Sequence, residues 1–156
     1  MKTNTCSFIG HREISVTTEL EQQVYSIIKE LVAIKNVNTF LFGSKSCFNR
    51  LCYEQVSKLK AVYPYIKRIY VRAEFPQIDQ DYRDYLLKYY EDTDYPQKLI
   101  NAGRAVYVER NRIMIDRSDF CVFYCQEDYK PHNRKSGTKL ALDYAMEKNK
   151  EILRLE

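Results

Sequence analysis

The sequence predicts an α/β fold, a single Rossmann-like three-layer domain with a mainly parallel sheet of about five strands. Short apolar runs alternate with segments of helical periodicity, which is typical of a parallel sheet covered by helices on both faces. The first two apolar runs each end at a glycine. The chain has 156 residues with no Pro/Gly/Ser-rich linker and no internal repeat, so we expect residues 1–156 to form one domain.

Five apolar runs are predicted to be strands. They are Thr5 to Ile9, Thr39 to Phe42, Ile66 to Val71, Phe120 to Tyr124 and Ile152 to Leu155. Because strands joined through helices pair in parallel, their carboxyl ends are expected to meet at one edge of the sheet.

Two helices are predicted in the first half of the chain. The first begins at about Thr17, and the hydroxyl of Thr17 or Thr18 can cap it. Its apolar face comprises Leu20, Val24, Ile27, Ile28 and Leu31. The second begins near Phe48 and is stopped by Pro64, because proline cannot continue a helix.

The second half of the chain is less regular. Tyr82 to Tyr90 is predicted to be helical and is followed by an irregular stretch. Val106 to Asp116 is expected to begin extended and to become a short helix through Arg110-Asn111-Arg112. A polar loop, Gln126 to Ser136, then leads to a last helix that begins at Gly137-Thr138.

The composition excludes some functions. No apolar run approaches the roughly 18 residues of a membrane helix, and the first residues lack the h-region of a signal peptide, so we expect a cytoplasmic protein. The net charge of +4 comes from dispersed lysines and arginines, which does not compel nucleic-acid binding. Five cysteines without a C-x-x-C pair, and two histidines, predict a reduced chain with no metal site.

The tyrosine content is unusual. The chain has 14 tyrosines and no tryptophan, and seven of the tyrosines lie between Tyr63 and Tyr90. This segment is interpreted either as amphipathic packing or as a self-association face, which would be compatible with a homodimer.

Three predicted strand ends or helix entrances carry residues that suit an anion. They are Gly10-His11-Arg12, Gly43-Ser44-Lys45-Ser46 and Ser136-Gly137-Thr138. Glycine lets backbone N–H groups approach an oxyanion, arginine binds it with two donors, and a helix N-terminus favours negative charge. Neither a G-x-G-x-x-G nor a G-x-x-x-x-G-K-[ST] motif is present, so no dinucleotide cofactor and no NTP hydrolysis are expected.

Each candidate side chain has two possible roles, one in ligand binding and one in local structure or at the surface. His11 is a ligand contact or acid/base group, or else a locally packed loop histidine. Arg12, Lys45 and Arg110 are anion contacts or solvated surface residues. Asn111 is a ligand contact or a helix cap. Beyond these, His132 lies in a basic loop that either closes over a ligand or is simply exposed.

Several segments, in order along the chain, resemble the YpsA-like branch of the SLOG superfamily. Cys6-Ser7-Phe8-Ile9-Gly10-His11-Arg12 is similar to its opening C-x-F-[TI]-G-H-R, and Arg110 to Asp116 to its R-N-x-x-M-V-D. Gly43 to Glu54, Lys60 to Ile66 and Gly137-Thr138 resemble its G-x-x-x-G-F-D, K-x-x-Y-P-x-I and G-G-T segments. Lonely-guy phosphoribohydrolases and DprA-like proteins belong to the same superfamily.

This resemblance implies a Rossmann-like domain that binds nucleotides or nucleotide-derived small molecules, either to sense them or to cleave their N-glycosidic bond. Four positions depart from the family patterns: Cys47, Asn49, Ser136 and Ala141. Ala141 stands where the phosphoribohydrolases have their catalytic glutamate, so a stabiliser of the developing oxocarbenium charge is lost.

We therefore expect binding or sensing of a nucleotide-derived ligand without catalysis. The first alternative is an N-glycosidic hydrolase that uses Glu109 or Asp116, with Glu54 as the other nearby carboxylate. The second alternative is a protein-interaction module in cell division or defence. The predicted ligand-binding residues are Gly10, His11, Arg12, Gly43, Ser44, Lys45, Phe48, Asn49, Arg110, Asn111, Ser136, Gly137 and Thr138.

Overall fold

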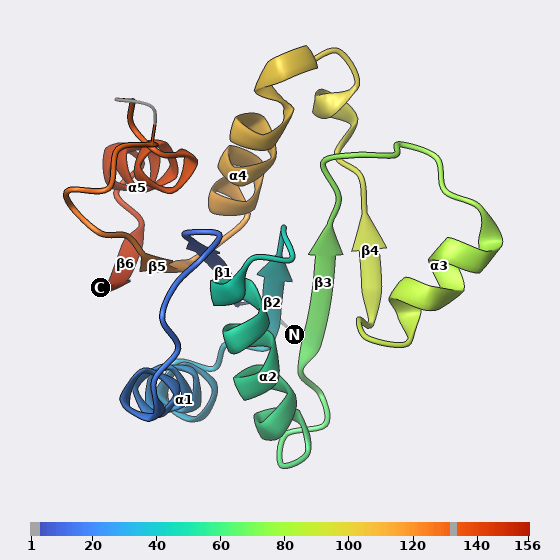
Figure 1. Ribbon diagram of the computed structural model, residues 1–156. Helices are drawn as coiled ribbons and strands as arrows, with labels where there is room; N and C mark the ends of the chain where they lie inside the picture. The colour runs from blue at the N-terminus through green and yellow to red at the C-terminus, as the bar shows by residue number, and fades with distance from the viewer. Residues whose placement is uncertain (1–3, 132–133) are drawn as a thin grey trace.

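A computed structural model describes residues 4–131 and 134–156. The first half of the chain alternates strands and helices (Figure 1). Its elements are β1 (Thr5–Gly10), α1 (Thr18–Ala33), β2 (Thr39–Phe42), α2 (Cys47–Lys60), β3 (Lys67–Val71), α3 (Gln80–Leu87) and β4 (Asp92–Asp94). The helix starts agree with the prediction, and the Thr17 hydroxyl caps α1 by accepting from the N–H of Leu20.

The second half contains two short 3-10 turns, η1 (Gln97–Leu99) and η2 (Gly103–Ala105), before the remaining regular elements. These are α4 (Val106–Asp116), β5 (Phe120–Tyr124), α5 (Gly137–Glu147) and β6 (Glu151–Leu155). The expectation that residues 106–116 begin extended is wrong, because the whole segment is helical. Val106, Tyr107 and Val108 favour strands locally, but α4 packs on α5 and β1, and this packing overrides the local preference.

All strand pairs are parallel, and the order in the sheet is β4-β3-β2-β1-β5-β6. The predicted Rossmann-like fold class is therefore confirmed, with six strands in place of about five. The sixth is β4, an edge strand of three residues that pairs with β3. Its sequence, Asp92-Thr93-Asp94, is three residues long and has no apolar run, so periodicity could not reveal it.

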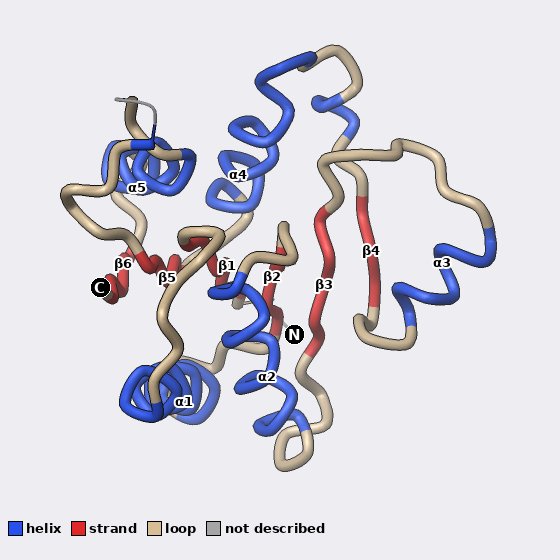
Figure 2. Tube along the Cα trace, viewed as in Figure 1, coloured by secondary structure: helices blue, strands red, loops and turns tan. Residues whose placement is uncertain are grey.

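The helices cover both faces of the sheet (Figure 2). α1 and α2 pack together on one face, and α4 and α5 pack together on the other. The larger core, between the sheet and α1 and α2, includes a stacked pair of phenylalanines, Phe8 and Phe40, with ring centroids 5.6 Å apart. The smaller core, under α5, joins Ile9, Phe123 and Ala141. In Figure 1, α3 lies beyond β4, outside the two layers.

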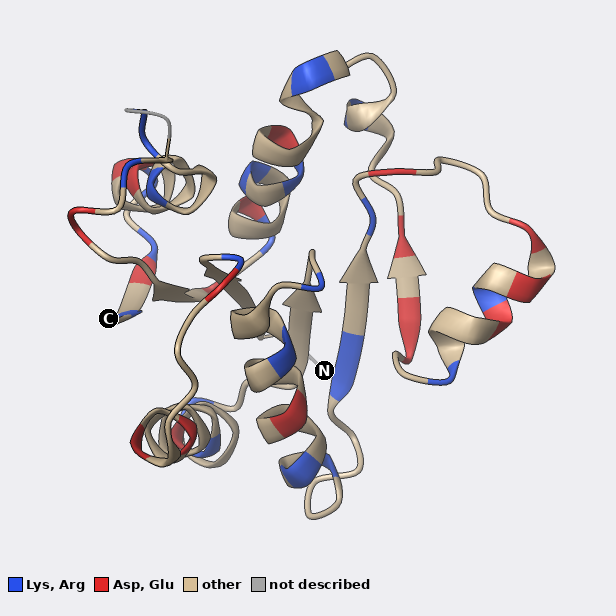
Figure 3. Cartoon of the chain, in the orientation of Figure 1, with Lys and Arg blue, Asp and Glu red and all other residues tan. Residues whose placement is uncertain are grey.

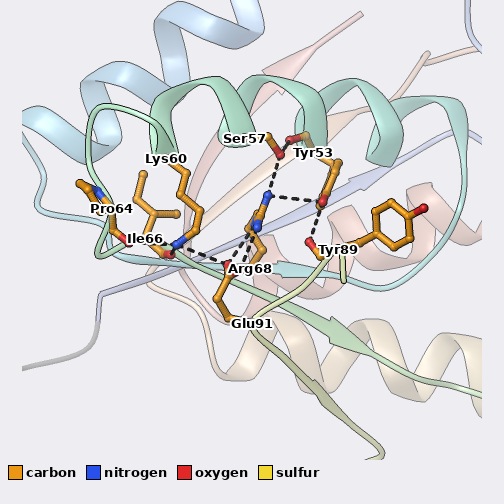
Figure 4. A network of polar contacts seen from close by, with 8 residues as sticks. All are labelled: Tyr53, Ser57, Lys60, Pro64, Ile66, Arg68, Tyr89 and Glu91. Carbon is orange, nitrogen blue, oxygen red and sulfur yellow. Dashed lines mark hydrogen bonds and ion pairs between the residues drawn. The ribbon is translucent and has the colours of Figure 1, made fainter. Parts of the chain in front are cut away.

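The edge strand β4 is tied to α2 by a group of polar contacts that we call the Arg68 network (Figure 4). Arg68 on β3 forms an ion pair of 2.8 Å with Glu91, which precedes β4. The same guanidinium donates to the hydroxyls of Tyr53 and Ser57 on α2, and Tyr53 in turn donates to the carbonyl of Tyr89. These contacts lie at the amino ends of β3 and β4, at the opposite edge of the sheet from the carboxyl ends.

Charged residues of both signs are interspersed along the helices, and basic residues do not gather on one element (Figure 3). Among the described residues, no helix has the length and apolar content needed to cross a membrane.

Candidate functional site

A cavity of about 750 Å³ lies at the carboxyl edge of the sheet. This volume is in the range of small-molecule sites, and the carboxyl ends of parallel strands are where open α/β sheets bind ligands. Its wall includes residues of the loops after β1, β2, β3 and β5, of α3 and α4, and of the entrance of α5. The lining includes Gly10, His11, Arg12, Gly43, Ser44, Lys45, Asn49, Tyr70, Arg72, Glu74, Phe75, Tyr82, Tyr107, Arg110, Asn111, Met114, Tyr129, Ser136, Gly137 and Thr138.

Twelve of the thirteen predicted ligand-binding residues line this cavity, and the exception is Phe48. The Phe48 ring is fully buried in the larger core. It lies directly beneath Gly10, where a Cβ would approach it to 2.4 Å. Gly10 is thus explained by the close packing of β1 on α2, and Phe48 supports the cavity floor from below.

Asn49 lines the cavity but holds the two strand ends together. Its Oδ1 accepts from the N–H groups of Gly43 and Ser44 at 3.2 and 3.3 Å, and its Nδ2 donates to the carbonyl of Phe8 at 3.1 Å. An aspartate at this position could not donate to Phe8. Since Asn49 occupies both N–H groups, the turn after β2 presents side chains to a ligand in place of those backbone donors.

Arg110 occupies the centre of the cavity wall. Its guanidinium donates to the carbonyl of Gly43 and, through Nε, to Asn111 Oδ1 at 3.0 Å. Gly43 makes room for it, because a Cβ there would lie 2.8 Å from Arg110 Nε and 2.7 Å from Met114 Sδ. The second glycine-marked strand end is therefore built to admit the arginine of α4.

Arg110 is only 6% exposed, yet within residues 4–131 and 134–156 no carboxylate forms an ion pair with it. Burial lowers the pKa of Arg110 from its ordinary value, and the nearby Tyr70 and Glu74 only partly offset this effect. A buried guanidinium stays charged and is costly without a counter-charge. An anion in the cavity would supply that counter-charge.

The entrance of α5 faces the same space. The Ser136 hydroxyl caps the helix by accepting from the N–H of Lys139 at 3.0 Å. A Cβ built on Gly137 meets no described residue within 4 Å, so the described part of the chain leaves the space beside this glycine open. The N–H groups of a first helical turn point outward and favour negative charge. Ser136, one of the four positions that depart from the family patterns, is thus a helix cap.

His11 is anchored to the neighbouring loop. Its Nε2 accepts from the backbone N–H of Gln126 at 2.8 Å, which places the proton of the neutral ring on Nδ1. Its ring packs against Tyr129 with centroids 4.4 Å apart. Burial lowers the pKa of His11 from its ordinary value. His11 is therefore packed against the loop after β5 and also lines the cavity.

The sequence prediction did not include the loop after β3, which contributes Arg72, Glu74 and Phe75 to the cavity. Arg72 is 7% exposed and donates to Thr93 Oγ1 at 3.0 Å and to the carbonyls of Phe75 and Pro76. The rule that ligands bind beyond strand ends would have identified this segment, because it directly follows a predicted strand.

The carboxylates proposed for catalysis lie elsewhere. Glu54, Glu109 and Asp116 do not line the cavity; Glu109 pairs with Arg112, and Asp116 accepts from the Tyr144 hydroxyl at 2.7 Å. Ala141 is 3% exposed and belongs to the core under α5. Among the described residues, Glu74 is the one carboxylate that lines the cavity, and it accepts a hydrogen bond from Tyr107.

Four of the five segments that carry the resemblance to the SLOG superfamily contribute residues to this cavity, among them Gly10-His11-Arg12, Arg110-Asn111 and Gly137-Thr138. The fifth, Lys60 to Ile66, precedes β3 and does not line it. The candidate lid residue His132 lies outside the described residues. A scan against protein-family models found no match to the sequence, and neither did a search of curated proteins. Membership of the superfamily therefore stays a prediction.

Proposed function

We propose that this chain is a SLOG-like domain that binds an anionic small molecule, a nucleotide or nucleotide-derived compound, and holds it without cleaving it. The observation that carries the proposal is the buried guanidinium of Arg110, which faces a cavity of about 750 Å³ with no acidic partner among the described residues. A phosphate accepts two parallel hydrogen bonds from arginine and supplies the missing counter-charge.

Two further features support an anion. The open first turn of α5 offers backbone N–H groups and a helix dipole to the same cavity. Arg12 and Lys45, which also line it, are exposed and add positive charge near the mouth. The described lining has four cationic side chains, Arg12, Lys45, Arg72 and Arg110, against one carboxylate, Glu74, and such an excess of positive charge attracts anionic ligands.

The test is a thermal shift of the purified protein with AMP and ADP-ribose, each up to millimolar concentration. A ligand that binds only the folded state raises the Tm in proportion to ln(1 + [L]/Kd), so we expect a concentration-dependent rise. Arg110→Met should abolish the rise. Arg117→Met changes the charge equally at an exposed arginine outside the cavity and should leave it intact. No shift with either nucleotide would contradict the proposal.

A second candidate is cleavage of an N-glycosidic bond, and one observation favours it: the Glu74 carboxylate lines the cavity beside Tyr107. A carboxylate near the anomeric carbon can stabilise the oxocarbenium charge. We place this candidate second because Glu74 is exposed and the position of the family's catalytic glutamate is Ala141 in the core. Chromatography of free base released from AMP or NAD, with Glu74→Gln as the comparison, decides between binding and turnover.

A further inference from the structure

One end of the cavity, the end over β3, is built from aromatic side chains that the sequence prediction did not assign to the site. Tyr70, Phe75, Tyr82 and Tyr107 all line it. Phe75 is 59% exposed and Tyr107 is 49% exposed. Phe75 meets Tyr82 edge-on, with ring centroids 6.4 Å apart. Large apolar surface left uncovered beside a cavity marks a place where a ligand or partner packs.

Phe75 is held in an unfavourable backbone conformation. Its φ is +58°, in the left-handed region that residues with bulky side chains rarely adopt. The buried Arg72 fixes this conformation by donating to the carbonyls of Phe75 and Pro76. A strained turn that is pinned by a buried arginine, and that leaves an aromatic ring exposed at a cavity, is typical of a ligand clamp.

Charged side chains are distributed unevenly along the cavity. Of its four cations, Arg72 lies at the aromatic end, where its Nε, Nη1 and Nη2 all donate within the protein, to Thr93 and to the carbonyls of Phe75 and Pro76. The other three, Arg12, Lys45 and Arg110, belong to the loops after β1 and β2 and to α4, and the turn at Gly137 belongs to α5. Glu74, the one acidic residue among the described lining, follows β3 and is next to Phe75. An anionic group is therefore favoured toward β1 and α5 and disfavoured at the aromatic end.

The order of the strands in the sheet sets the distance between the aromatic end of the cavity and the end near β1. β2 lies between β1 and β3 in the sheet, so the loops after β1 and β3 are about 10 Å apart, twice the spacing of neighbouring strands. A compact ion cannot contact both ends. An elongated molecule with a phosphate at one end and a ring at the other matches this separation.

Resting on the proposed function, we infer that the ligand is a phosphorylated nucleoside bound in one orientation, with its base against Phe75 and Tyr107 and its phosphate toward Arg110 and α5. The base contributes by stacking, which every nucleobase can do because each has a π face. Glu74 then faces the neutral, donor-bearing part of the ligand, the ribose hydroxyls or an amino group of the base.

The test is isothermal titration of the full chain with two probes, AMP and ribose 5-phosphate, which share the phosphate and sugar but differ in the base. We expect AMP to bind about tenfold or more tightly than ribose 5-phosphate, the size of one stacking contact. Phe75→Ala should weaken AMP by about tenfold and leave ribose 5-phosphate within about twofold. Phe75→Tyr should retain the affinity for AMP.

A matched control is Tyr89→Ala, which removes an exposed aromatic ring beyond the cavity and should change neither affinity. Equal binding of the two probes to the wild type, or equal weakening of both by Phe75→Ala, overturns the inference while the proposed function stands. Binding of neither probe overturns the proposed function as well, so the two failures are distinguishable.

Discussion

Arg68 and Arg110 are two arginines withdrawn from solvent in the same domain, and their surroundings differ in one respect. Arg68 meets the Glu91 carboxylate with both Nε and Nη2, at 2.9 and 2.8 Å, and adds hydroxyl partners on α2. Arg110 has a backbone carbonyl and an amide as partners and, among the described residues, no carboxylate. The first is neutralised inside the protein, whereas the second faces a cavity.

The pKa values follow the same division. Hydrogen bonds donated to Glu91 raise the pKa of Arg68, although burial opposes the charged form. Burial dominates at Arg110 and lowers its pKa. The comparison teaches that burial of an arginine alone says little about its role, and that the supply of counter-charge separates an arginine that holds the fold from one that is available to a ligand.

The largest effect is expected from removing the counter-charge of Arg68. Glu91→Ala leaves a largely buried guanidinium without its carboxylate and removes three hydrogen bonds. We expect the free energy of unfolding, measured by urea unfolding, to fall by about 3 kcal/mol. In thermal unfolding this corresponds to a fall in Tm of about 6–12 °C. Asp94→Asn on the same edge, where the ion pair with Arg117 is exposed, should cost no more than about 0.5 kcal/mol.

The pH dependence of the stability difference between the wild type and Glu91→Ala identifies whether the ion pair with Arg68 causes that difference. Burial opposes the charged form of Glu91, but the hydrogen bonds from Arg68 outweigh it and lower the pKa of Glu91 from its ordinary value of 4.5. A lowered carboxyl pKa stabilises the fold fully above the unfolded value, and this contribution is lost as the pH falls through the folded value. The gap between wild type and Glu91→Ala should therefore shrink below about pH 4.5; a gap independent of pH would point to packing instead.

The next largest effect on stability is expected at Gly43, the glycine that makes room for the Arg110 side chain. Gly43→Ala places a methyl group 2.8 Å from Arg110 Nε and 2.7 Å from Met114 Sδ. We expect a loss of about 1–3 kcal/mol in the free energy of unfolding, because these side chains must shift, and weaker nucleotide binding. Gly137→Ala, with nothing within 4 Å of the added methyl, is the matched control for stability. If Gly43→Ala is as well tolerated, Arg110 does not depend on this glycine.

The smallest effect is expected for Arg110 itself. Arg110→Met removes a desolvated charge and keeps most of the apolar packing, while the hydrogen bonds to Gly43 and Asn111 are lost. These changes oppose each other, so the free energy of unfolding without ligand should stay within about 1 kcal/mol of the wild type. Urea unfolding measures it. A loss as large as that of Glu91→Ala would show that Arg110 is structural and would remove the contrast with Arg68.

Much of the site was predictable because it follows from chain geometry. Glycines directly after apolar runs, such as Gly10 and Gly43, mark the carboxyl ends of strands, and parallel pairing brings those ends to one edge. The helix entrance at Ser136-Gly137 joins the same edge for that reason. The loop after β3 was missed although the same rule covers it, because Arg72 and Phe75 follow their strand without a glycine.

Other features left no local signal. β4 is a polar edge strand, and its three residues have neither an apolar run nor alternation. The first turn of α4 is rich in residues that favour strands, yet packing on α5 makes it helical. Asn49 and Phe48 are adjacent in the sequence, but one bridges two strands and the other fills the core. Such roles depend on contacts between residues far apart in the chain.

Hydrophobic periodicity and glycine placement are local properties, and they were enough to predict the α/β class, the first strands and helices, and most of the loops that meet at the carboxyl edge. Which charges are neutralised, in contrast, follows from the three-dimensional arrangement. Whether Arg68 or Arg110 finds a carboxylate depends on partners such as Glu91, brought close by the pairing of β3 with β4. The electrostatic cost of burial is set by three-dimensional surroundings, which the order of residues does not display.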